Sequence, residues 1–131
     1  MKIAVVGVGY VGLVSGVCLA SIGHRVVCVD VDENKIRRLK QGHIPIYEPG
    51  LEELMKKCVA NKHLSFTTSI KEATKHGEAI FIAVGTPSKK NGDADLTYVE
   101  NVARAIALNL TIPCGLAAGR KGKFENRRFS R

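Results

Sequence analysis

Three glycines and one aspartate carry the clearest chemical signal in this sequence. Gly7, Gly9 and Gly12 have the spacing G-x-G-x-x-G and follow the apolar run 2–6, while Asp30 ends the next apolar run. In such a pattern the first glycine permits a tight turn, the second lets a pyrophosphate approach the backbone, and the third lets a helix pack closely on a sheet. Unpaired N–H groups at the N-terminus of that helix attract phosphates. The spacing therefore predicts a dinucleotide-binding turn.

Asp30 adds a specificity element to this turn. It lies 18 residues after Gly12, where a carboxylate accepts hydrogen bonds from the hydroxyls of an adenosine ribose. The same charge repels the ribose phosphate of NADP, so the pattern predicts NAD. A structural turn followed by a surface acid is the alternative interpretation.

Two further residues fall near the same predicted site. Lys35, near the start of the helix after Asp30, either reaches the adenosine end of the cofactor or is an ordinary solvated lysine. Thr86, at the carboxyl end of the fourth predicted strand, either contacts the cofactor or only ends the strand before Pro87. Ligands of open α/β sheets bind beside the carboxyl ends of the strands, which favours contact for Thr86 and leaves both interpretations of Lys35 open.

The elements that must position these residues alternate along the chain. Apolar runs predict strands at 2–6, 24–30, 63–68 and 78–85, of which the last is strongly buried. Helical patterns cover 10–22 and 48–61, and further helices follow the capping residues Asp32, Ser69 (with Glu72) and Thr97 (with Glu100). The face of the last helix is predicted at Val99, Val102, Ala103, Ile106 and Leu110.

This alternation predicts the α/β class, as a Rossmann-type doubly wound parallel sheet with helices on both faces. The sheet is expected to be incomplete, with about four to five strands, because no buried strand is recognisable after Leu110. We therefore predict a truncated dinucleotide-binding domain over 1–110 and a divergent basic tail over 111–131.

Composition excludes several classes of function. The tail holds six of the 20 basic residues and one of the 12 acidic ones, so 1–110 carry a net charge of only +3 and do not favour a nucleic-acid face. The sequence contains neither a long apolar span nor a signal-peptide pattern, which predicts a cytoplasmic protein with no membrane segment. Cys18, Cys28 and Cys58 lie in apolar patterns and are expected to be buried reduced thiols, and no cysteine or histidine spacing indicates a metal site.

Four segments together resemble the N-terminal domain of the UDP-glucose 6-dehydrogenase family, within the nucleotide-sugar dehydrogenases that include GDP-mannose enzymes. They read KIAVVGVGYVGLVSGVCLASIGHRVVCVDVDENKI, GHIPIYEPGLEELM, AIFIAVGTP and DADLTYVE, and they span residues 1 to about 110 in register. The resemblance implies a Rossmann domain that binds NAD. It implies cofactor contacts at Gly7, Gly9, Tyr10, Val11, Gly12, Asp30, Lys35 and Thr86.

Enzymes of that family oxidise the C6 alcohol of the sugar to a carboxylate in two NAD-dependent steps, in the service of nucleotide-sugar metabolism and polysaccharide biosynthesis. The resemblance places their catalytic cysteine in a later region that this chain lacks, so UDP-glucose would bind only through that missing C-terminal half. Cys114 has neither a base nor an oxyanion site near it in the sequence. We therefore expect no catalytic residue in this chain and no dehydrogenase activity from it alone.

Other functions remain open from the sequence. A non-catalytic NAD-binding or sensing module, dimeric through an open fourth strand, is the main alternative. A methyltransferase that uses S-adenosylmethionine also has a glycine-rich first loop and an acid after its second strand. The tail is interpreted as a shifted reading frame or a recombinant addition, as the divergent end of a native short protein, or as a basic arm that contacts nucleic acid.

Overall fold

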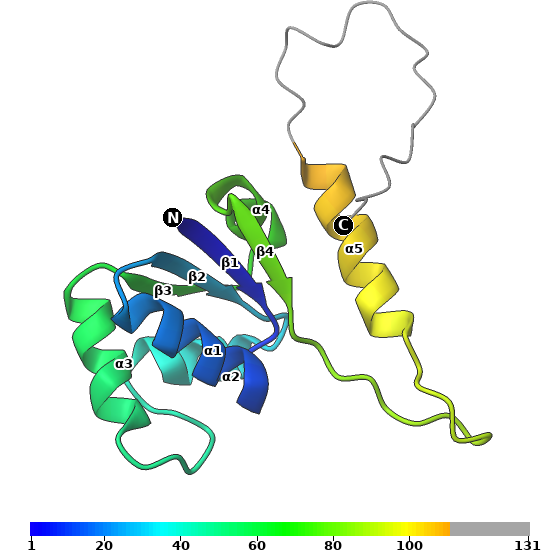
Figure 1. The fold of residues 1–131 in the computed structure, drawn as a ribbon, viewed down its shortest axis with the longest axis horizontal. Helices are drawn as coiled ribbons and strands as arrows, with labels where there is room; N and C mark the ends of the chain where they lie inside the picture. Colours follow the sequence, from blue (N-terminus) through cyan, green and yellow to red (C-terminus); the bar gives the residue numbers. More distant parts are fainter. Residues whose placement is uncertain (111–131) are drawn as a thin grey trace, which may run out of the picture.

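A four-stranded parallel sheet forms the centre of the computed structural model, which describes residues 1–110 (Figure 1). Its spatial order is β3-β2-β1-β4, so the chain starts in the middle of the sheet and builds outward in both directions. The strands are β1 (Lys2–Val6), β2 (Arg25–Val29), β3 (Leu64–Thr67) and β4 (Ala79–Ile82). The order confirms the Rossmann-type α/β prediction and places β4 beside β1.

Five helices cover the two faces of this sheet. They are α1 (Tyr10–Ser21), α2 (Glu33–Lys40), α3 (Leu51–Ala60), α4 (Ile70–His76) and α5 (Thr97–Asn109). The first three lie on one face and α4 on the other, while α5 stands beyond β4 and contacts α4 (Figure 1). Because every crossover carries a helix, the carboxyl ends of all four strands meet at one edge.

The face under α1, α2 and α3 holds the larger hydrophobic core. Alternate residues of β1 and β2 point into it, and α1 supplies Leu13 and Val17, both fully buried. Cys28 belongs to this core, and its burial raises the pKa of the thiol to about 12. The prediction of buried thiols is confirmed for Cys28 and Cys58 and wrong for Cys18, which lies on the outer side of α1 and is exposed.

The opposite face is less well covered. Its core is built on Ala4, Val6 and their neighbours in β2, with Val102 and Ile106 of α5 only partly buried against it. Within the described residues, none of the α5 side chains is buried. The buried face predicted for this helix is therefore wrong at Ala103 and Leu110, which are exposed to solvent.

The prediction of a strongly buried fourth strand is wrong. Phe81 and Ile82 are 48% and 38% exposed. The physical reason is position, because β4 is an edge strand of the described sheet and has a neighbouring strand on the β1 side alone.

The local signals at the helix starts are confirmed in two of three cases. The Asp32 carboxylate accepts hydrogen bonds from the N–H groups of Asn34 and Lys35, and the Ser69 hydroxyl accepts one from Glu72 N–H. The cap expected at Thr97 is wrong, because Thr97 is itself the first residue of α5. The carboxylate of Asp95 accepts from its N–H at 3.0 Å instead.

Candidate functional site

The glycine-rich turn connects β1 to α1 at the carboxyl edge of the sheet. Gly7 has a φ of +101°, a conformation that L residues other than glycine rarely adopt, and its N–H donates to the Val29 carbonyl at 2.8 Å. A Cβ on Gly7 would lie 2.6 Å from the Ala83 carbonyl oxygen, which belongs to the segment after β4. The turn is thus held between β2 on one side and the end of β4 on the other.

Different physical reasons account for the glycines at positions 9 and 12. A Cβ on Gly12 would lie 1.9 Å from the Gly7 carbonyl oxygen, so the packing of α1 against the turn excludes any side chain there. A Cβ on Gly9 would meet no described atom within 4 Å, and its backbone is extended with φ −68°. Nothing in the described part of the protein itself requires a glycine at position 9, whereas a ligand approaching the backbone would.

The carboxylate of Asp30 ties the turn to the end of β2. One oxygen accepts a hydrogen bond from Val8 N–H and the other from Asp32 N–H, both at 2.9 Å. Each carboxylate oxygen has two lone pairs, so both can accept a further donor. Asp30 therefore combines a structural role with a position suited to ribose hydroxyls.

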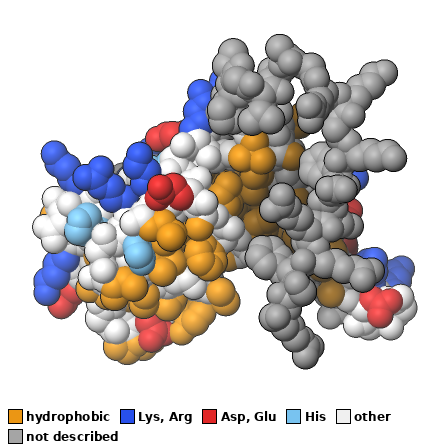
Figure 2. Space-filling model, turned by 45° about the horizontal axis from the view of Figure 1, so that its top comes forward, with side chains coloured by type: hydrophobic (Ala, Val, Ile, Leu, Met, Phe, Trp, Pro, Cys, Tyr) orange, Lys and Arg blue, Asp and Glu red, His pale blue; other side chains and the backbone are white. Residues whose placement is uncertain are grey.

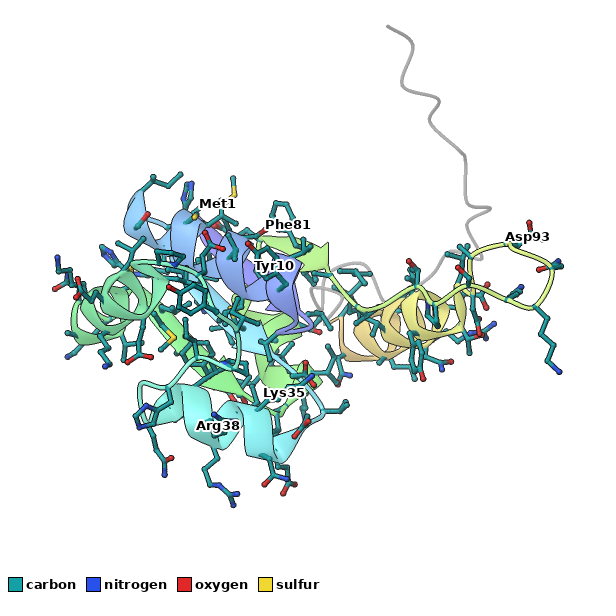
Figure 3. All side chains as sticks on the ribbon, turned by 90° about the horizontal axis from the view of Figure 1, so that it is seen from below. Met1, Tyr10, Lys35, Arg38, Phe81 and Asp93 are labelled. Carbon is teal, nitrogen blue, oxygen red and sulfur yellow. The ribbon has the colours of Figure 1, made fainter. Side chains whose placement is uncertain are left out.

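A pocket of about 310 Å³ opens beside this turn. It brings together Gly7, Gly9, Asp30 and Lys35, four residues that the sequence predicted as a site. Lys35 projects from α2, as Figure 3 shows, and supplies a positive charge beside the carboxylate. The remaining lining residues are Ala83, Val84, Gly85 and Tyr98.

A second pocket, of about 380 Å³, continues from the first between the sheet edge and α5. The two share Gly7, Asp30, Val84 and Tyr98, and the second is mainly apolar. Its other walls are Val6, Val29, Val31, Thr68, Ile70, Asn101, Val102 and Ala105. A pocket that contains the charged residues Asp30 and Lys35, joined to a mainly apolar one, suits a ligand with phosphates and a ribose at one end and an aromatic base at the other.

Sequence reasoning missed most of the walls of this second pocket. Val31 lies two residues after β2 and Thr68 directly after β3, and a search of the residues after each strand would have found them. Tyr98 and Asn101 had no such signal, because they reach the pocket from α5, more than 60 residues after Asp30. Their role depends on where α5 lies in space.

The other predicted cofactor residues lie at the start of α1 and after β4. Tyr10 and Val11 form the first turn of α1, with exposed side chains, and Gly12 is buried beneath them. Thr86 is exposed one residue beyond Gly85 and is not among the residues that line either pocket, so its contact with a cofactor stays a prediction.

Tyr10 is held by a residue from a distant segment. Its hydroxyl donates a hydrogen bond to the Glu48 carboxylate, which belongs to the segment between α2 and α3. This bond and the negative charge of Glu48 raise the pKa of the Tyr10 phenol. Both effects favour the protonated phenol, which is the form that donates to Glu48.

Comparison with known proteins decides the family. Residues 1–113 match the UDP-glucose/GDP-mannose dehydrogenase family, NAD binding domain. The chain belongs to this family. NAD is accordingly the cofactor of this domain, and the resemblance seen in the sequence is confirmed.

Individual relatives include enzymes named for two different sugar nucleotides. UDP-glucose 6-dehydrogenase TuaD of Bacillus subtilis is 58% identical over 109 residues, which are 83% of this chain and 24% of the relative. The crystal structure of a ternary complex of GDP-mannose dehydrogenase from Pseudomonas aeruginosa matches with a TM-score of 0.80 and 49% identity over 83% of this chain and 25% of that one. A UDP-glucose dehydrogenase from the archaeon Pyrobaculum islandicum matches with a TM-score of 0.77 and 48% identity, over 81% and 25% of the two chains.

The chain spans about a quarter of the length of the relatives it matches. These matches cover the fold and the pockets described above, up to the end of α5. Among the described helices, none has the length and apolar content needed to cross a membrane.

Proposed function

We propose that this domain binds NAD with the pyrophosphate over the turn at 7–12, the adenosine ribose at Asp30 and Lys35, and the adenine in the apolar pocket walled by Tyr98. The observation that carries this assignment is Gly9. Within residues 1–110 no contact requires a glycine there, but a pyrophosphate lying against the backbone would collide with a side chain.

The start of α1 supports the same placement. Its N-cap residue is Gly9, with no side chain to occupy the N–H groups of the first turn, and that turn contains no acid. These N–H groups and the positive end of the helix dipole are thus free to bind phosphate oxygens.

The negative charge of Asp30 gives the site its selectivity for NAD over NADP. A ribose with free hydroxyls donates to the Asp30 carboxylate, while the phosphate of NADP at this position would be repelled by it. When bound, NAD supplies the acceptor for a hydride. The residues of this chain bind and orient it and shield its adenine from water.

We further propose that the domain is the cofactor-binding part of an enzyme that oxidises UDP-glucose to UDP-glucuronate, and that the chain alone has no such activity. Hydride transfer needs an alcohol held against the nicotinamide, and positioning supplies much of the rate. The two pockets hold the residues that we assign to the dinucleotide, and we propose that the sugar binds elsewhere in the enzyme. A non-catalytic NAD-binding module is the alternative, and turnover of UDP-glucose by the chain would overturn both views.

Location and assembly complete the proposal. We place the protein in the cytoplasm, because Cys28 and Cys58 are buried free thiols, which suits a reducing compartment.

We also propose that two copies pair through the exposed edge of β4, where backbone groups face away from β1. Sedimentation equilibrium tests the dimer, and a concentration-independent monomer mass would contradict it.

The test is calorimetric titration of the chain with NAD⁺ and NADP⁺. We expect binding of NAD⁺, with NADP⁺ at least about tenfold weaker. Gly9→Ala should weaken NAD⁺ binding at least about tenfold while the melting temperature is unchanged. Asp30→Ala should also weaken binding, but it removes the hydrogen bond to Val8 as well and is less clean.

Asp93→Ala is the matched control for the charge change. Asp93 lies in the loop between β4 and α5, far from the glycine-rich turn in Figure 3. Its replacement should leave NAD⁺ affinity unchanged. Equal affinity of the Gly9→Ala variant and the unmodified chain would overturn the placement of the pyrophosphate.

A further inference from the structure

The contact between Tyr10 and Glu48 joins two parts of the chain at the start of the cofactor-binding helix. Tyr10 is the first residue of α1 and directly follows Gly9, and Glu48 lies 38 residues later. Among the described residues, this is the side-chain hydrogen bond made by the turn 9–12. Together with the hydrogen bond from Val8 N–H to the Asp30 carboxylate, it ties the glycine-rich turn to other parts of the domain through side chains.

The segment that carries Glu48 is itself firmly held. Ile44 and Ile46 pack against the main core, and the Glu48 carbonyl accepts a hydrogen bond from Leu51 N–H at 3.2 Å. Gly50, with a φ of +78°, then turns the chain into α3. Because α3 follows Gly50 and packs along α1, the backbone at Glu48 is anchored to the body of the domain.

A restraint of this kind solves a problem that ordinary capping would create. A Ser, Thr or Asp at the N-cap stabilises a helix start by accepting a hydrogen bond from one of the first N–H groups. In a phosphate-binding turn those N–H groups are needed by the ligand. Glu48 holds the turn through the phenol of Tyr10 and leaves the N–H groups unpaired.

We propose that Glu48 is a positioning residue for the pyrophosphate-binding turn, which it acts on through the Tyr10 hydroxyl. This inference rests on the proposed NAD site and deepens it. The carboxylate does not touch the cofactor in this view. It fixes the first turn of α1 in the geometry that binds the pyrophosphate, so that less ordering is needed when NAD binds.

The experiment is a double-mutant cycle on NAD⁺ affinity in the full chain, measured by calorimetry, with the melting temperature of each variant measured in parallel. Tyr10→Phe and Glu48→Ala should each raise the Kd for NAD⁺ by about 3- to 10-fold, as expected for a partly exposed hydrogen bond to a charged group. The double variant should be no weaker than the weaker single variant, because both remove the same contact. Glu48→Gln should restore most of the affinity, since its amide oxygen still accepts.

Glu52→Ala is the matched control. Glu52 lines the same surface depression as Glu48 and forms an exposed ion pair with Lys56, but it does not contact Tyr10. Its replacement should leave the Kd unchanged.

Two results would overturn the inference. One is a lower melting temperature with an unchanged Kd in the single variants, which would make the contact merely structural. The other is independent, additive effects of the two substitutions on the Kd. Failure of the unmodified chain to bind NAD⁺ would be a different outcome, because it would overturn the proposed function itself and the inference with it.

Discussion

The two faces of the sheet differ in how completely they are covered. The face under α1, α2 and α3 buries fifteen residues in one cluster, whereas the face under α4 and α5 buries five and completes its core with half-exposed side chains. Exposed hydrophobic side chains are also extensive on the surface in Figure 2. The core on the first face is therefore well packed, whereas the core on the second face is small and partly open to solvent.

The difference shows where stability and function reside. The glycine-rich turn, Asp30 and Lys35 all belong to the β1-α1-β2-α2 half, which rests on the larger core. Tyr98 and Asn101 approach the same site from α5, on the weakly covered side. The turn proposed to bind the phosphates and the carboxylate proposed to bind the ribose therefore rest on the better packed side, and the wall of the apolar pocket depends on a less firmly held helix.

The largest expected effect is that of Gly12→Ala. Its Cβ would overlap the Gly7 carbonyl oxygen, a backbone atom that cannot move without opening the turn. We expect a loss of at least about 3 kcal/mol in the free energy of unfolding, measured with urea. Gly9→Ala, three residues earlier, should change it by less than about 0.5 kcal/mol. If both substitutions lowered the free energy of unfolding equally, the difference in room for a Cβ at Gly9 and Gly12 would have no effect on stability.

A matched pair of valines tests the two faces directly. Val17 of α1 is fully buried and Val102 of α5 is only partly buried, so replacing each by alanine removes the same atoms from different surroundings. We expect Val17→Ala to cost about 2–3 kcal/mol in urea unfolding, and Val102→Ala less than about 1 kcal/mol. Similar losses would mean that α5 is as well packed as α1.

Hydrogen exchange sharpens the comparison without substitutions. Amides in the middle of α1 should exchange only with global unfolding, while those of α5 should exchange at least about tenfold faster through local opening. The physical reason is that no α5 residue in the described structure is buried. Addition of NAD⁺ should slow exchange in α5, because Tyr98 and Asn101 line the pocket. Equal protection of the amides in α1 and α5 would show that the two helices are equally well packed, and would contradict this prediction.

The smallest effect is expected at the junction of β4 with β1. The Glu78 carboxylate accepts from Lys2 N–H at 2.7 Å, and this bond, with the nearby N-terminus, Lys2 and His76, lowers the pKa of Glu78. A carboxyl whose pKa is lower in the folded state stabilises the protein above its unfolded pKa, about 4.3 for Glu, and loses that contribution as the pH falls through the folded value.

Glu78→Gln should therefore reduce the urea midpoint slightly at pH 7 and not at all once the pH lies below the folded pKa. The measurement is the urea midpoint of both proteins as a function of pH. Two curves that stay parallel down to the lowest pH would show that the charge of Glu78 has no part in holding the β4 side.

Much of the fold could be predicted from local patterns. The alternation of apolar runs gave all four strands and the parallel class, since periodicity depends only on which side of an element is buried. Asp32 could be identified as a cap because capping involves residues only two or three positions apart. The Thr97 cap failed because α5 already begins at Thr97, whose N–H and hydroxyl both donate to the Asp95 carboxylate.

The residues 111–131 lie outside the described structure, so the predicted division of the chain at residue 110 and the interpretations of the basic tail stay predictions. The same holds for the individual cofactor contacts, of which the structure places Gly7, Gly9, Asp30 and Lys35 around one pocket.

By itself the sequence identified the glycine-rich turn, because G-x-G-x-x-G and an acid 18 residues later act over a distance that one strand-helix-strand unit spans. Only the tertiary structure decided which distant side chains complete the site. The segment before α3 brings the Glu48 carboxylate to the Tyr10 hydroxyl, and α5 brings Tyr98 to the pocket that Asp30 also lines. Both arrangements depend on how these helices pack in space. The exposure of β4 was likewise decided in space, since an apolar strand is buried only where something lies beside it.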